Sequence, residues 1–132
     1  MNPTQIIAAA LVVGGGLSIQ PASAQQSEIK RTELTRSDLG DSVREVIQTR
    51  VDFPPGAAFP KHSHPGVEVA FVIEGRMEYQ LDGRPPVTLK AGDSLFIPAQ
   101  TAHSARNVGS DNASELATYV VDKGKPLVVV AP

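Results

Sequence analysis

The chain has 132 residues, which at roughly 100–200 residues per domain leaves room for one domain. Its 14 acidic and 12 basic side chains give a formal net charge of -2, so the sequence argues against nucleic-acid binding. Cysteine is absent, which excludes disulfides, thiolate metal sites and cysteine catalysis. Eleven glycines and eleven prolines favour short strands and tight turns over a helical bundle.

The N-terminal region differs sharply in composition from the rest of the chain. Residues 1–26 carry no charged side chain, and residues 6–17 form an apolar run shorter than the roughly 20 residues that span a bilayer. Ala22 and Ala24 supply small residues where a signal peptidase reads them. We predict a secretory signal peptide over residues 1–24, a periplasmic or secreted mature chain, and no stable membrane anchor after cleavage. Without cleavage the same domain would be cytoplasmic.

The remaining sequence predicts a series of strands. Residues 43–53 alternate apolar and polar side chains, as a half-buried strand does, and residues 67–73 form a nearly continuous apolar run typical of an interior strand. Residues 77–81 alternate again, and Asp82-Gly83 predicts a hairpin to a partner strand at residues 87–90. Further strands are predicted at residues 94–97, 103–108, 116–121 and 127–130. One short stretch, residues 36–40, is compatible with a single helical turn. The pattern indicates an all-β sandwich or barrel.

The three histidines are the most informative residues. His62 and His64 are two apart, so on a strand both imidazoles point to one face and can converge on one ion. Glu68 has the same parity and lies between two valines, where an unpaired carboxylate is costly and binding to a cation would stabilise it. Taken alone, a His-x-His pair is more often a surface coincidence or part of a polar turn than a metal site, and the glutamate could instead form a cross-strand ion pair.

The spacing of the histidines within two motifs resembles the cupin superfamily. The first motif contains Gly56, His62, His64, Glu68 and Gly75, and the second contains Gly92, Pro98, His103 and Asn107. Gln100 departs from the family pattern, which usually has a turn glycine there. The resemblance covers residues 56–107 and implies a small antiparallel β-barrel, the double-stranded β-helix or jelly roll of small single-domain cupins. Residues 56–132 would form the barrel core, and residues 25–55 an N-terminal segment with the first strands.

The resemblance also implies one divalent transition metal per chain, bound by His62, His64, Glu68 and His103. Three nitrogens and one oxygen suit Fe, Mn, Ni, Zn or Cu, so the metal is not fixed by the ligands. Four protein ligands leave two positions of a six-coordinate ion for water, substrate or O2, which favours catalysis over a structural role. The motif glycines, proline and Asn107 are predicted to be structural, with Asn107 satisfying backbone groups near a strand end.

Other groups must then transfer protons and shape the pocket. The proton-transfer candidates nearest in sequence are Lys61, Glu74, Glu78 and Tyr79, although the parity of Tyr79 also suits a core residue. The predicted pocket residues are Ala70, Ala102 and Ala105, which would leave space, and Phe53, Phe59, Phe71 and Phe96, which would line it. Arg106 is predicted on the opposite face of its strand from His103.

Three functions fit this sequence. The first is a dioxygenase-like metalloenzyme that acts on a small molecule, and the second is a metal-dependent isomerase, decarboxylase or lyase without redox change. The third is a non-catalytic periplasmic module that binds a small ligand or metal. Because the apolar tail at residues 127–130 would be an exposed edge in a monomer, we also predict a homodimer.

Overall fold

The regular elements of the protein are β-strands throughout the part of the chain that the structure describes. The computed structural model describes residues 28–40 and 43–132, so the predicted signal peptide and its cleavage site lie outside it. The strands are β1 (Lys30–Asp38), β2 (Arg44–Phe53), β3 (Ala58–Ser63), β4 (Gly66–Glu74), β5 (Arg76–Leu81), β6 (Val87–Lys90), β7 (Ser94–Ile97), β8 (His103–Asn107), β9 (Ala113–Asp122) and β10 (Val129–Val130). In these residues no helix has the length and hydropathy needed to cross a membrane.

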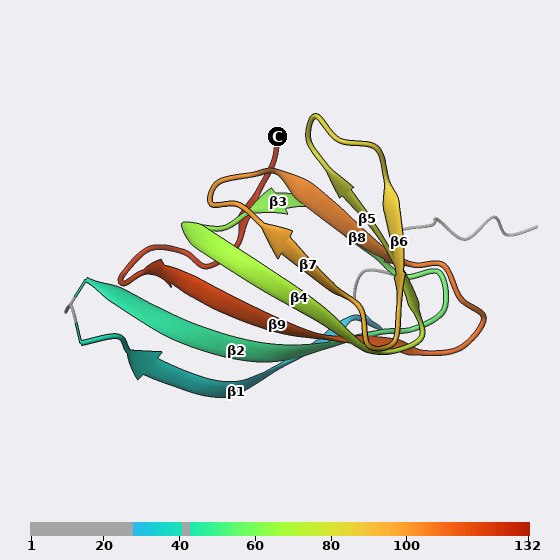
Figure 1. Ribbon diagram of the computed structural model, residues 1–132, viewed down its shortest axis with the longest axis horizontal. Helices are drawn as coiled ribbons and strands as arrows, with labels where there is room; N and C mark the ends of the chain where they lie inside the picture. The colour runs from blue at the N-terminus through green and yellow to red at the C-terminus, as the bar shows by residue number, and fades with distance from the viewer. Residues whose placement is uncertain (1–27, 41–42) are drawn as a thin grey trace, which may run out of the picture.

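The strands form two five-stranded antiparallel sheets. The first has the order β1-β2-β9-β4-β7 and the second β10-β3-β8-β5-β6. Figure 1 shows the first sheet as a row of neighbouring strands from β1 to β7. In residues 28–40 and 43–132 no strand pairing joins one sheet to the other, so the predicted barrel is an open jelly roll of two facing sheets. The predicted all-β cupin fold class is confirmed.

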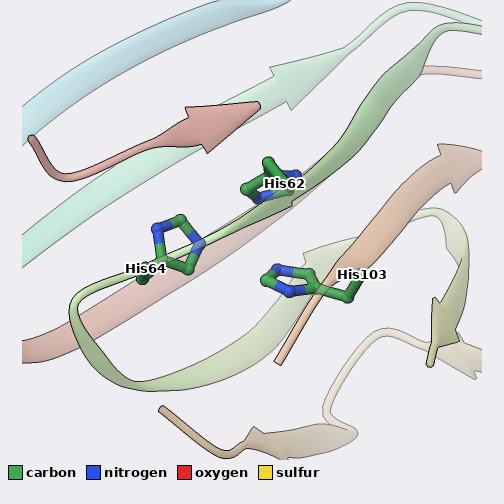
Figure 2. A group of neighbouring side chains, drawn as sticks. All are labelled: His62, His64 and His103. Atoms are coloured by element: carbon green, nitrogen blue, oxygen red, sulfur yellow. The ribbon is translucent and has the colours of Figure 1, made fainter. Parts of the chain in front are cut away.

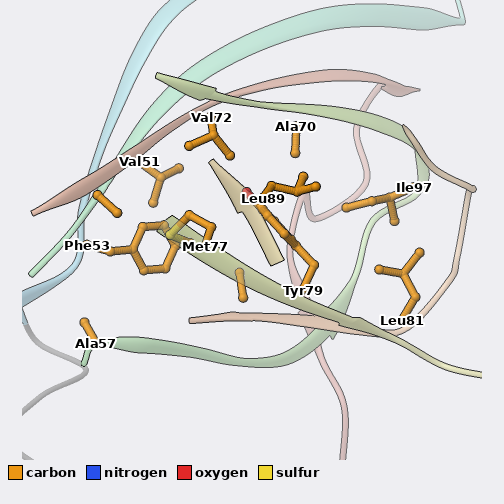
Figure 3. Close-up of a cluster of buried hydrophobic side chains, with 12 residues drawn as sticks. Val51, Phe53, Ala57, Ala70, Val72, Met77, Tyr79, Leu81, Leu89 and Ile97 are labelled. Carbon is orange, nitrogen blue, oxygen red and sulfur yellow. The ribbon is translucent and has the colours of Figure 1, made fainter. Parts of the chain in front are cut away.

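The core lies between the two facing sheets. Val51 of β2 and Val72 of β4 come from the first sheet, whereas Met77 of β5 comes from the second, and all three belong to one buried cluster (Figure 3). Each large apolar side chain buried in this way stabilises the fold by roughly 1.5–3 kcal/mol. In β2, the apolar side chains of Ile47, Val51 and Phe53 are buried, as the alternation of apolar and polar residues in its sequence predicts. Val43 is exposed, because it precedes the first residue of β2.

The N-terminal part of the described chain corrects one prediction. Residues 36–40 were expected to include a helical turn, but residues 30–38 are strand β1, which pairs with β2 along its length. Eight of the nine residues of β1 are exposed, so its sequence has no apolar alternation to reveal the strand. Backbone hydrogen bonds to β2 define β1, and Arg31 is its one residue that is partly buried.

Gly75 and Gln100 are among the motif residues that adopt left-handed turn conformations. Gly75 has φ +79°, and a Cβ there would lie 2.6 Å from the Cβ of Ala113, so only glycine fits. Gln100, which replaces the usual glycine, adopts φ 58° and keeps the turn at a cost of about 1–2 kcal/mol. Its N–H donates a 3.1 Å hydrogen bond to the carbonyl of His64, so this turn is joined to a histidine segment.

Candidate metal centre

Three strand segments bring the predicted ligands together. His62 of β3 and His103 of β8 are directly paired across the second sheet. His64 follows β3 immediately, and Glu68 projects from β4 of the opposite sheet. All four side chains are buried, with at most 5% of each residue exposed. The fold therefore places the four predicted ligands inside one space between the sheets.

The histidine rings converge closely. One nitrogen from each of His62, His64 and His103 lies within 4.8 Å of the corresponding nitrogen of the other two. Figure 2 shows the three rings turned toward one another, two from the end of β3 and one from β8. Oε2 of Glu68 lies 2.9 Å from Nε2 of His64 and 3.3 Å from Nε2 of His103. Three histidine nitrogens thus converge, and a carboxylate oxygen lies beside two of them.

Backbone carbonyls fix the orientation of each imidazole. Nδ1 of His62 lies 2.7 Å from the carbonyl of Pro60, Nδ1 of His64 lies 2.6 Å from that of Leu127, and Nδ1 of His103 lies 2.9 Å from that of Thr101. A carbonyl can only accept, so each Nδ1 carries a proton and, in the neutral ring, each Nε2 presents a lone pair. Backbone acceptors that fix the tautomer are the usual support of metal-binding histidines.

The buried atoms at the centre test whether a cation fits. Nε2 of His64 and Oε2 of Glu68 lie 2.9 Å apart, yet neither has a hydrogen-bond partner of acceptable geometry. Two buried acceptors that face each other are destabilising, and a divalent ion between them would satisfy both lone pairs. The residues present therefore fit a metal ion.

Electrostatics agree with this interpretation. Burial is the main cause of the lowered pKa of His62, about 4, so this imidazole is neutral at pH 7. Burial alone would raise the pKa of Glu68, but the adjacent His103 and His64 outweigh it and lower that pKa to about 2. Burial alone would lower the pKa of His103, but Glu68, the carbonyl of Thr101 and the charge of Glu115 together outweigh it and raise that pKa. Glu68 is thus a carboxylate that requires positive charge beside it, either a proton on a neighbouring imidazole or an ion.

The metal centre opens onto a small cavity. Its volume is about 10 Å3, close to the minimum that one water molecule requires. Ten residues line it: Arg31, Phe53, Phe59, His62, Glu68, Tyr79, His103, Ala105, Glu115 and Tyr119. The cross-strand pair Ala70 and Ala117 separates the row that contains Glu115 from the row that contains Glu68 and Tyr119.

A buried acid on the cavity wall was not predicted from the sequence. The hydroxyl of Tyr79 donates a 2.5 Å hydrogen bond to Oε2 of Glu115, from the opposite sheet. Burial, followed by repulsion from Glu68, raises the pKa of Glu115 to about 7. Burial raises the pKa of Tyr79 as well. The sequence contained a signal for this position, because Glu115 alternates in phase with Ala113 and Ala117, which face inward on β9. Tyr119 has the same phase and was not predicted either.

The other predicted pocket residues separate into two groups. Phe53, Phe59 and Ala105 line the cavity as expected, whereas Ala70 and Ala102 do not. Phe71 and Phe96 are exposed, because they fall on the outer face of the first sheet. Among the proton-transfer candidates, only Tyr79 reaches the cavity. Lys61 pairs with Asp82 at the surface, Glu78 pairs with Arg106, and Glu74 contacts Arg50. Arg106 is exposed, as predicted from its parity.

Asn107 of the second motif has the predicted structural role. Its buried side-chain amide donates to the carbonyls of Phe53 and Asp111 at 2.9 and 2.8 Å, and its side-chain oxygen accepts from the N–H of Gly109 at 2.9 Å. The loop that leaves β8 and the end of β2 are therefore held together by one side chain. This residue supports the fold around the metal centre without reaching it.

Parts of the chain are similar in sequence to two kinds of known protein. Dimethylsulfoniopropionate lyase DddQ of Ruegeria pomeroyi is 38% identical over 56 residues, which are 42% of this chain and 28% of DddQ. A putative germin-like protein 3-4 of Oryza sativa subsp. japonica is 26% identical over 130 residues, 92% of this chain and 54% of the relative. This chain therefore spans only about a quarter to a half of the length of these relatives.

Solved structures share the fold. The crystal structure of DddQ from Ruegeria pomeroyi superposes with a TM-score of 0.69 and 24% identity over 86% of this chain and 56% of that chain. A recombinant oxalate oxidase in complex with glycolate gives a TM-score of 0.65 and 23% identity over 89% and 62%. At this identity the structures show a common fold alone. Residues 49–121 match the family Cupin_2, described as a cupin domain, and the chain therefore belongs to the cupin family.

Proposed function

We propose that the protein is a metal-dependent enzyme that removes a proton from a small substrate and eliminates a leaving group, a lyase without redox change. The hydrogen-bonded Tyr79–Glu115 pair carries this proposal, because it puts a proton acceptor on the wall of the cavity that contains the histidine cluster. The name of the relative DddQ describes a lyase. The matched segment is short, so the argument rests on this chain's own residues.

The metal ligands in the proposal are His62, His64, Glu68 and His103. These residues would hold a divalent ion, which would supply Lewis-acid chemistry toward a substrate oxygen and so favour loss of a proton from the neighbouring carbon. The backbone carbonyls behind the three imidazoles hold the ligand set in place before substrate arrives. The metal is one of Fe, Mn, Ni, Zn or Cu, and its identity is left to measurement.

Proton transfer is assigned to Tyr79 and Glu115. The Tyr79 hydroxyl already donates to Glu115, so a proton taken from the substrate passes through this hydrogen bond and remains on the carboxyl group. A carboxyl whose pKa is about 7 binds and releases a proton near neutral pH. The electron pair left on carbon forms a double bond as the leaving group departs with its own bonding pair. The buried cavity wall excludes bulk water from this exchange.

Turnover with and without oxygen tests the proposal. The metal-loaded protein is incubated with dimethylsulfoniopropionate under argon and in air, and dimethyl sulfide is measured in the headspace while an electrode records O2. We expect equal sulfide release in both atmospheres and no O2 uptake. O2 consumption that depends on an added substrate such as glycolate or oxalate would refute the lyase and favour the dioxygenase-like alternative. Turnover of none of these substrates would favour the non-catalytic binding module.

Two glutamate variants locate the proton acceptor. Glu115→Gln keeps an acceptor for the Tyr79 hydroxyl but cannot take up a proton, so we expect kcat to fall roughly 100-fold or more with unchanged metal content. Glu78→Gln is the matched control, because Glu78 neighbours Tyr79 on β5 but faces outward to Arg106. Full activity of Glu115→Gln would refute the assignment.

We also propose that the protein acts as a homodimer. Val129 and Val130 form the edge strand β10 of the second sheet and are 50% and 58% exposed. An exposed apolar edge is a template for pairing with another chain. Light scattering of the purified protein tests this, and a monomeric mass would refute it.

A further inference from the structure

The mouth of the cavity is formed by two side chains. Of the ten residues that line the cavity, eight are buried, and only Arg31 and Phe59 are partly accessible. Solvent and substrate therefore reach the histidine cluster past these two residues. The guanidinium carbon of Arg31 lies 5.7 Å from the centre of the Phe59 ring, within the range of a cation–π contact. The entrance thus carries a positive charge against an aromatic face.

Arg31 is held in this position by the fold. It is the one residue of β1 that is partly buried, and its Nη2 donates a 3.2 Å hydrogen bond to the hydroxyl of Tyr119. The Tyr119 ring in turn packs against the ring of His64, with centroids 4.7 Å apart. A chain of contacts therefore links the guanidinium at the mouth to a predicted metal ligand.

The charge of Arg31 is not neutralised by a close carboxylate. Within residues 28–40 and 43–132 it forms no ion pair. Burial raises the pKa of both Glu115 and Tyr119, and the charge of Arg31 partly offsets that rise, at Tyr119 together with the hydrogen bond. One hydrogen bond to Tyr119 leaves most of the five guanidinium N–H donors available for a ligand.

We propose that Arg31 is a specificity-determining residue that binds the anionic group of the substrate, and that this substrate is a small carboxylate. The planar guanidinium matches a carboxylate with two parallel N–H donors, and the Phe59 and Tyr119 contacts fix its direction. The cavity behind it has a volume of only about 10 Å3, so the carboxylate group would bind at its mouth, beside Arg31, and only a small part of the substrate could extend inward. This inference rests on the proposed function and names the substrate class of the same site.

Calorimetric titration of the full-length protein loaded with Zn tests the inference directly. The probes are malonate, which is anionic, and malonamide, its neutral counterpart. We expect the wild type to bind malonate more tightly than malonamide, and Arg31→Gln to weaken malonate binding roughly 10-fold to 100-fold, as loss of a charged hydrogen bond predicts. Arg31→Lys, which keeps the charge but loses the planar pair of donors, should lie between these two proteins.

A matched variant on the same strand controls for net charge. Arg36→Gln removes one positive charge from β1, but Arg36 pairs with Glu33 and Glu45 at the surface, so malonate binding should not change. The Zn content of each variant, measured by elemental analysis, shows that the metal centre is intact. Equal malonate affinity of wild type and Arg31→Gln would overturn the inference, as would a wild type that does not prefer malonate to malonamide.

These outcomes are separable from failure of the proposed function. If Arg31→Gln loses malonate affinity while Glu115→Gln keeps full activity, the anion site stands and the proton-acceptor assignment fails. If Glu115→Gln is inactive and Arg31→Gln binds malonate normally, the proton-acceptor assignment stands and the anion site fails.

Discussion

Replacing Glu115 with glutamine should change how stability depends on pH. The buried environment raises the pKa of Glu115 from 4.5 to about 7, so the folded state disfavours the carboxylate that the unfolded chain forms readily. For a carboxyl with a raised pKa, the free energy of unfolding is highest below pH 4.5 and falls as pH rises to about 7. At roughly 1.4 kcal/mol for each pH unit, this decrease totals about 3 kcal/mol.

His62 opposes this trend in the wild type. Its pKa falls from 6.5 to about 4 on folding, so its contribution is complete above pH 6.5 and is lost as pH falls toward 4. The two slopes nearly cancel between pH 4.5 and 6.5, and the wild-type curve alone is therefore uninformative. Subtracting it from the Glu115→Gln curve isolates Glu115, because His62 is present in both proteins.

Urea unfolding of both proteins from pH 4.5 to 8 provides the measurement. The metal is removed with a chelator, since a bound cation would itself favour the carboxylate. We expect the stability of Glu115→Gln, relative to wild type, to rise by about 3 kcal/mol across this range. Tyr79→Phe removes the hydrogen bond that lowers the pKa of Glu115, so that pKa should rise further. The free energy of unfolding of Tyr79→Phe should therefore continue to fall at a pH above the one where the wild-type decrease ends. A difference between Glu115→Gln and wild type that is constant with pH would refute the reasoning.

Further variants test the support of the site. Asn107→Ala removes three side-chain hydrogen bonds and should cost about 3 kcal/mol in urea unfolding without changing metal stoichiometry. Gln100→Gly should raise stability by up to about 1 kcal/mol, because glycine adopts φ 58° without strain; a loss of stability would contradict the turn assignment. Gly75→Ala should cost at least about 2 kcal/mol, given the clash with Ala113. Zn at 100 times its Kd should stabilise the wild type by about 2.7 kcal/mol in thermal unfolding but leave His103→Ala unchanged.

The histidine motif could be predicted from the sequence because strand parity is local. Two histidines separated by one residue share a face of any extended strand, and Glu68 has the same parity in the adjoining strand. The resemblance to cupins then supplied His103. For the same reason, the hairpin at residues 77–90 and the interior strand at residues 67–73 were predicted, each from a pattern contained within a few residues.

Strand β1 could not be predicted from its sequence. It is defined by hydrogen bonds to β2 and has almost no buried side chain, so neither apolar alternation nor a turn signal marks it. Since Arg31 belongs to this strand, the positive charge at the mouth was also absent from the sequence interpretation. The role of Leu127 was missed similarly, because its contribution to His64 is a backbone carbonyl.

The sequence alone determined the fold class, the parity of the ligands and the residue types available for metal binding. Tertiary structure decided which side chains from different sheets meet. Tyr79 and Glu115 are 36 positions apart and come from opposite sheets, and their hydrogen bond arises only when the sheets face each other. The raised pKa of Glu115 likewise depends on burial and on Glu68, which no pattern within a single strand contains. Long-range register and desolvation therefore create the proposed proton acceptor, whereas local alternation creates the ligand set.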